Sequence, residues 1–160
     1  MPEVLSIWVK AEILRGSRWV LCSKCLKFVN PEIYRMISEW GVVLEFCPEE
    51  NGQVVYGKIA SMMRSSPPSK LYVVTIDGSP HCFTLHAAVN EAVYILGEDI
   101  EKEHYVVVDG KELRRISPES VRVARYLSLV ERLISENDWV LEELKKHSLE
   151  YRAVLEKTKK

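Results

Sequence analysis

The fold is decided by the stretch LYVVTI, residues Leu71–Ile76, which is followed by Asp77 and Gly78. The stretch is rich in β-branched residues and apolar on both of its faces, so it predicts a strand buried on both sides of a sheet. The Asp-Gly pair ends the strand in a turn. Strands covered on both faces are typical of parallel sheets, whose neighbouring strands need a crossover connection.

The chain on either side of this strand alternates between strand and helix patterns. Asn30 and Pro31 open a helix that Gly41 closes, and Gly97 caps a helix that follows the decisive strand. The other predicted strands are Trp19–Leu21, ending near Ser23, then Val42–Phe46 and Tyr105–Val108. Such alternation predicts an α/β domain with a mostly parallel sheet flanked by helices.

Three further segments complete the predicted organisation. Val4–Arg15 has apolar residues at helical spacing and is expected to form a helix. Residues 48–69 contain several turn signals and are expected to form a loop with a short element near residues 54–63. Ser117-Pro118-Glu119 opens a long helix, and a break around Asn137-Asp138 separates it from a last, charged helix that reaches Lys157. We therefore expect a cysteine-site domain over residues 1–116 and a helical extension over 117–160 that packs on it or forms a homodimer.

Composition restricts the class of protein. The chain has 160 residues, 47% of them hydrophobic, which suits one self-supporting domain. A formal net charge of -1 gives no strong nucleic-acid signal and does not favour an anionic membrane. The sequence has no apolar run of membrane-spanning length and its N-terminus does not resemble a signal peptide, so we expect a cytoplasmic protein. Few Asn and Gln and many charged residues are typical of a thermophile.

Three of the four cysteines follow predicted strands. Cys25 comes after the first strand, Cys47 after the second and Cys82 after the third. The carboxyl ends of parallel strands meet at one edge of the sheet, which is where ligands bind in such folds. In a reducing compartment, cysteines gathered in this way favour metal binding or catalysis over disulfides. The sequence therefore predicts a shared metal site, most simply an iron–sulfur cluster.

These cysteines lie in three short words. SKCLKF at 23–28, CPE at 47–49 and SPHC at 79–82 resemble, in the same order, three motifs of the 2-thiouracil desulfurase family. The resemblance covers roughly residues 18–97. It implies that Cys25, Cys47 and Cys82 hold a [4Fe–4S] cluster with one iron lacking a protein ligand. It also implies that Glu49 transfers protons, that Ser79 assists beside that iron, and that sulfur is removed from a thiolated nucleobase or similar thiocarbonyl substrate.

The chain departs from the family in places that shape the substrate pocket. NPEIY at 30–34 stands where the family has an Arg-Tyr-Asp/Asn-Gly run, and Phe83 stands where a glycine usually follows the third cysteine. The family's Gly-Leu and Pro-Arg loop is not visible over residues 50–57. Cluster binding therefore transfers to this chain better than the substrate does.

Several alternatives stay open on the sequence alone. Cys22 forms a C-x-x-C pair with Cys25, and as a fourth ligand it would give a closed site of structural or electron-transfer type, with iron–sulfur or Zn²⁺. His81 is a further candidate ligand or hydrogen-bond donor, whereas His86 is more typical of a core or helix-surface histidine. The cysteines can also be small buried hydrophobes in a metal-free interaction domain.

Overall fold

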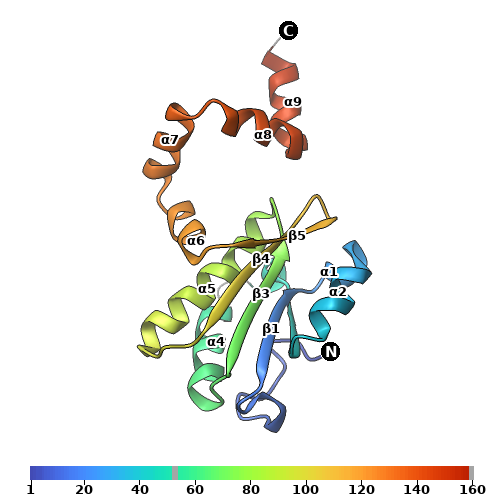
Figure 1. Ribbon diagram of the computed structural model, residues 1–160, viewed down its shortest axis with the longest axis vertical. Coiled ribbons are helices and arrows are strands. Elements are labelled where there is room, and N and C mark those ends of the chain that lie inside the picture. The colour runs from blue at the N-terminus through green and yellow to red at the C-terminus, as the bar shows by residue number, and fades with distance from the viewer. Residues whose placement is uncertain (52–53, 159–160) are drawn as a thin grey trace. The chain divides into compact units, whose positions relative to one another are not determined.

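A mostly parallel sheet forms the centre of the α/β unit in the computed structural model (Figure 1). Within the described residues its strands lie in the order β2-β1-β3-β4-β5. The first four of these pair in parallel, and the last pair is antiparallel. The predicted α/β fold is thus confirmed. The strands are β1 (Arg18–Ser23), β2 (Val42–Phe46), β3 (Lys70–Ile76), β4 (Lys102–Val108) and β5 (Glu112–Ile116).

The structure describes residues 1–51 and 54–158. By its internal contacts the chain divides into two units, Met1–Pro118 and Glu119–Lys160. The helical elements of the first unit are η1 (Glu12–Leu14), α1 (Leu26–Val29), α2 (Pro31–Ser38), α3 (Pro48–Asn51), α4 (Val54–Ser65) and α5 (Pro80–Leu96). Whether the second unit packs on the first, as the sequence predicts, stays a prediction.

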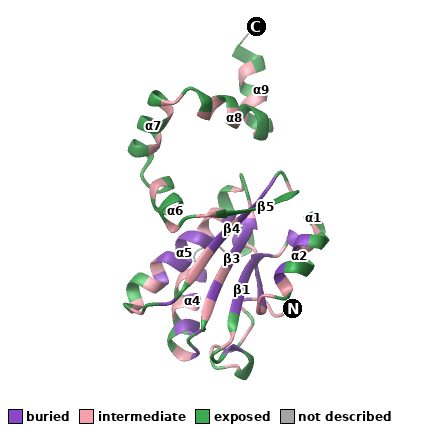
Figure 2. Cartoon of the chain, in the orientation of Figure 1, coloured by how far each residue is buried: buried purple, intermediate pink, exposed green. Residues whose placement is uncertain are grey.

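Helices cover the sheet on both faces, so there are two apolar layers (Figure 1). One layer lies between the sheet and helices α4 and α5, and the other lies under α1 and α2. Strand β1 serves both because its side chains alternate between the faces. Trp19 and Leu21 enter the α4/α5 layer, whereas Val20 and Cys22 enter the α1/α2 layer. The burial colours of Figure 2 show β1 as buried along almost its whole length.

The predicted helix over Val4–Arg15 is wrong. The segment has only the 3-10 turn η1, and tertiary hydrogen bonds hold the rest of it. Lys58 Nζ donates to the Ile7 carbonyl at 2.5 Å and Ser66 Oγ donates to the Val9 carbonyl at 3.0 Å. The Val4 N–H also donates to the Glu45 carbonyl at 2.9 Å, so bonds to distant parts of the chain override the helical spacing.

The region after the second strand is more helical than predicted. Residues 54–65 form the full helix α4, with Val55, Ile59, Met62 and Met63 buried along one face. Their spacing is that of an amphipathic helix. Gly57 was the misleading signal, because it lies at an exposed position where glycine costs a helix only about 1 kcal/mol. Residues 52–53, part of the predicted loop, lie outside the described residues.

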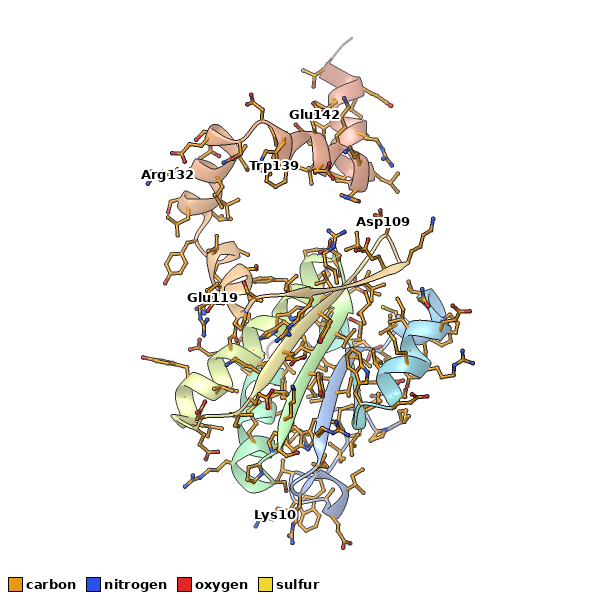
Figure 3. All side chains as sticks on the ribbon, viewed as in Figure 1. Lys10, Asp109, Glu119, Arg132, Trp139 and Glu142 are labelled. Carbon is orange, nitrogen blue, oxygen red and sulfur yellow. The ribbon has the colours of Figure 1, made fainter. Side chains whose placement is uncertain are left out.

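Strand β5 is an element that the sequence did not indicate. Asp109 (labelled in Figure 3) and Gly110 both take positive φ angles, 50° and 70°, and turn the chain back after β4. The resulting hairpin pairs β5 antiparallel to β4 at the sheet edge. Its charged residues suit an edge, where strands are typically protected from further pairing by charge.

The second unit is built from short helices. Its elements are α6 (Pro118–Ala124), α7 (Leu127–Glu136), α8 (Trp139–His147) and α9 (Leu149–Thr158). The predicted break near Asn137 is confirmed, but the predicted long helix is itself divided after Ala124 and the predicted last helix is divided at Ser148. Described residues of α7, α8 and α9 include no buried side chain (Figure 2). Trp139, labelled in Figure 3, is 65% exposed. In the part of the chain that the structure describes, no helix has the length and apolarity needed to cross a membrane.

Candidate functional site

The three predicted cysteines follow three adjacent strands, after the ends of the strands at the same edge of the sheet. Cys47 follows β2, Cys25 follows β1 and Cys82 follows β3, and these strands are neighbours in that order. The backbone N–H of Lys24 donates to the Phe46 carbonyl at 3.0 Å, which extends the β1–β2 pairing up to the two cysteines. The topology thus brings together the residues that the sequence spaced over 57 positions.

Cys25 lies between the other two and is open to solvent. It occupies the position before α1, and its carbonyl accepts hydrogen bonds from the N–H groups of Phe28 at 2.9 Å and Val29 at 3.1 Å. These bonds begin the helix and fix the backbone of the cysteine. The side chain is left exposed, so a ligand can reach its sulfur without opening the core.

Cys82 is held in the first turn of α5. Ser79 is the N-cap, with Pro80 next, and Ser79 Oγ accepts a hydrogen bond from the Cys82 N–H at 3.3 Å. The Cys82 thiol is buried and lies 3.2 Å from Ser23 Oγ at the end of β1. Ser79 therefore has a clear structural role, which is to position the first turn that carries Cys82.

The Cys25 thiol is influenced by acidic groups from the other two sequence words. Partial burial raises the pKa of this thiol, and the negative charges of Cys82, Cys47 and Glu49 raise it further.

Glu49 and His81 bring the second and third sequence words side by side. Glu49 lies in α3 directly after Cys47, and His81 lies in α5 directly before Cys82. Glu49 Oε1 is 3.7 Å from His81 Nε2, and both side chains are more than half exposed. A carboxylate and an imidazole are both groups that can transfer protons to a molecule bound within hydrogen-bond reach of them.

Two lysines that flank Cys25 pair with two carboxylates that flank Cys47. Lys24 Nζ lies 3.2 Å from Glu50 Oε2, and Lys27 Nζ lies 2.8 Å from Glu45 Oε2. Tyr34 donates its hydroxyl to Glu45 Oε1 at 2.6 Å. Burial raises the pKa of Glu45, but the hydrogen bonds from Lys27 and Tyr34 lower it more, so the net pKa lies below its usual range. These pairs tie the Cys25 loop to the end of β2.

Cys22 lies apart from this edge. Its side chain is fully buried in the α1/α2 layer, and Cys22 of β1 pairs with Glu45 of the neighbouring strand β2. Burial, followed by the negative charge of Glu45, raises the pKa of the Cys22 thiol to about 12. A thiol in this environment stays protonated and behaves as a small core side chain.

No single-ion site is formed by the side chains that the structure describes. Among these residues no group of three His, Cys, Asp or Glu side chains is arranged to hold a metal ion. Whether Cys25, Cys47 and Cys82 hold an iron–sulfur cluster or Zn²⁺ stays a prediction.

Sequence reasoning missed a second polar group, buried under α5. His86 Nε2 lies 2.8 Å from Thr75 Oγ1, and His86 Nδ1 lies 2.8 Å from His104 Nδ1. His104 Nε2 in turn lies 3.2 Å from Asn90 Oδ1. The available signal was the spacing of Cys82, His86 and Asn90, which at intervals of four fall on one helix face.

A model of the Rossmann-like domain family matches residues 11–160. The chain belongs to the Rossmann-like domain family. No curated protein and no solved structure matches it. In such sheets ligands bind where the strand order reverses, which in the order β2-β1-β3 is the crevice between β1 and β3. Cys25 and Cys82 flank that crevice, and the contact between Ser23 and Cys82 spans it.

The family resemblance does not extend to the usual dinucleotide fingerprint. In Rossmann folds a glycine-rich turn after the first strand lets the backbone approach a pyrophosphate. Here the turn after β1 is Ser23-Lys24-Cys25, and no glycine occurs between Arg18 and Trp40. The turn after β1 thus carries a thiol where the dinucleotide-binding Rossmann folds carry a phosphate-binding loop.

Proposed function

We propose that the protein is a [4Fe–4S]-dependent sulfur-handling enzyme that removes sulfur from a thiocarbonyl compound such as a thiolated nucleobase. The observation that supports this most is that Cys25, Cys47 and Cys82 end three adjacent strands at the ligand-binding edge of a Rossmann-like sheet. The three sequence words that resemble the 2-thiouracil desulfurase family coincide with these three positions.

In this proposal the three cysteines hold the cluster and Cys22 does not. A cluster with three protein ligands supplies an iron that is open to a substrate sulfur. Cys25 is exposed and central, so this side of the site is reached from solvent. Cys22 is enclosed on the α1/α2 face, which supports the open site over a closed four-cysteine site.

The remaining residues handle protons and orientation. The net reaction replaces the thiocarbonyl sulfur by the oxygen of water, so C=S and H₂O give C=O and H₂S with no change in oxidation state. Glu49 accepts the proton of the attacking water, and His81 lies 3.7 Å from that carboxylate. Ser79 uses its oxygen as acceptor for the Cys82 N–H, so its hydroxyl hydrogen can be donated to the substrate.

Iron and acid-labile sulfide, measured on protein purified without oxygen, test the proposal. We expect about four irons and four sulfides per chain. Cys25→Ser, Cys47→Ser and Cys82→Ser should each lose most of the iron, whereas Cys22→Ser is the matched control that keeps it. Loaded protein should release sulfide from a thiolated nucleobase, and Glu49→Gln should slow this roughly 100-fold or more with iron content unchanged.

Two results contradict the proposal. Absence of iron in folded, anaerobically purified protein would remove the cluster. Loss of iron in the Cys22→Ser variant, at wild-type stability, would make Cys22 a fourth ligand and would close the site to substrate. That second outcome would leave a structural or electron-transfer centre in place of an enzyme.

A further inference from the structure

One face of α5 is polar where a helix packed on a sheet is normally apolar. Cys82, His86 and Asn90 repeat every four residues and point at the sheet, and all three are buried. Each one meets a buried polar side chain of a strand. Cys82 lies against Ser23 of β1, His86 bonds Thr75 of β3, and both His86 and Asn90 bond His104 of β4.

The hydrogen bonds define where the protons lie. Asn90 Oδ1 can only accept, so His104 Nε2 carries the hydrogen of that bond. A neutral His104 then has a bare Nδ1, which accepts from His86 Nδ1–H. His86 Nε2 is bare in consequence and accepts from the Thr75 hydroxyl. All the bonds run in one direction, from Thr75 to Asn90, with both imidazoles neutral.

This series of hydrogen-bonded polar side chains costs free energy to bury in a core. Two imidazoles, an amide and a hydroxyl are removed from water, and Asn90 Nδ2 has no hydrogen-bond partner among the described residues. Apolar side chains would pack in the same layer at lower cost. Hydrogen bonds fix the position of the helix more closely than apolar packing does. An apolar helix face can slide or rotate on a sheet, whereas hydrogen-bonded pairs at successive helical turns prevent both movements.

We propose that His86 and His104 are positioning residues of the cysteine site: by bonding α5 to β3 and β4 they fix the helix on the sheet and hold the Cys82 sulfur against Ser23. The proposal rests on the proposed function only in taking Cys82 as a cluster ligand. It concerns the position of that sulfur before any metal binds, so it can be tested on metal-free protein.

The tautomers give the first test. Nitrogen-15 NMR of the histidine rings should find His86 in the Nδ1–H form and His104 in the Nε2–H form. The His86 ring should stay neutral between pH 5 and 8. The same tautomer in both rings, or titration of either ring near the ordinary histidine pKa, would contradict the hydrogen-bond directions described above.

The thiol of Cys82 gives the second test. Its alkylation rate in metal-free protein, followed by peptide mass mapping, reports how often α5 leaves its place. His86→Leu should raise that rate about tenfold, which corresponds to one decade in the opening equilibrium. His86→Gln should rescue most of the effect, because its amide reaches the Nε2 position and restores the bond to Thr75.

A matched control separates positioning from general stability. Val89 is buried on the same helix and belongs to the apolar layer, so Val89→Ala weakens α5 without touching the chain. At equal loss of thermal stability, Val89→Ala should change Cys82 alkylation far less than His86→Leu. Equal rates in the two variants would make the histidines merely structural and would overturn the proposal, whether or not the protein binds iron.

Discussion

The two faces of the sheet carry different kinds of polar group beneath the same cysteine edge. On the α1/α2 face, Glu45 is an anion that accepts from Lys27 and Tyr34, and the Lys27 side chain is 35% exposed. On the α5 face, His86 and His104 are neutral, enclosed and bonded to each other. Charged hydrogen bonds therefore stabilise the cysteine loops on one face, and uncharged hydrogen bonds stabilise them on the other. The stability that each group contributes should respond differently to mutation and pH.

Removal of Glu45 should have the largest effect on stability. Its carboxylate is 3% exposed, and Glu45→Ala leaves the Tyr34 hydroxyl and the Lys27 ammonium without their acceptor. Breaking a buried pair costs about 3–5 kcal/mol, and access of water to the lysine end brings this to about 2–3 kcal/mol. Urea unfolding measures it. Glu45→Gln keeps one acceptor oxygen and should lose less, and equal losses in the two variants would contradict this account.

Acid should weaken the histidine face by a slightly smaller amount. Burial, followed by the nearby His104, lowers the pKa of His86 to about 3 in the folded chain, against about 6.5 when unfolded. Between these values the unfolded state binds a proton that the folded state does not, so stability falls as pH drops below about 6.5. The loss at pH 5 relative to pH 7 is about 2 kcal/mol.

The control for this pH effect is His86→Gln. Unfolding free energies at pH 7 and pH 5 should differ by about 2 kcal/mol less in this variant than in the natural chain. Glu45 does not confuse the comparison, because its lowered pKa removes stability only at more acidic pH and is present in both proteins. The same pH slope in both proteins would mean that His86 is already protonated, or reachable by water, in the folded state.

The sequence predicted the positions of the cysteines but missed the polar groups on both faces beneath them, for a physical reason. Strands such as LYVVTI can be predicted from their local sequence pattern. The topology of a parallel sheet then predicts the position of the cysteines that follow them. No local sequence pattern links His86 with His104, because one lies in a helix and the other lies in a strand 18 residues later. Only the packing of α5 across β3 and β4 makes them partners.

The same distinction explains the errors in the fold. The Val4–Arg15 segment has helical spacing, but long-range bonds from Lys58 and Ser66 hold its backbone. Strand β5 has little β pattern of its own and exists because the Asp109–Gly110 turn returns it to β4. Local patterns therefore located the elements that bury apolar residues, and they failed where another part of the chain supplies the hydrogen bonds.

The smallest expected effect concerns Lys27, the water-exposed end of the charged face. Lys27→Met keeps the aliphatic stem and leaves Glu45 with Tyr34 as donor, so we expect a loss of about 1 kcal/mol or less. A double-mutant cycle with Glu45→Gln should give a coupling energy of about 0.5–1 kcal/mol, measured by urea unfolding. A coupling well above this range would mean that water does not screen the pair, and the contrast between an open charged face and a closed neutral face would fail. A coupling near zero would leave Tyr34 of α2 as the side chain that stabilises the Glu45 carboxylate.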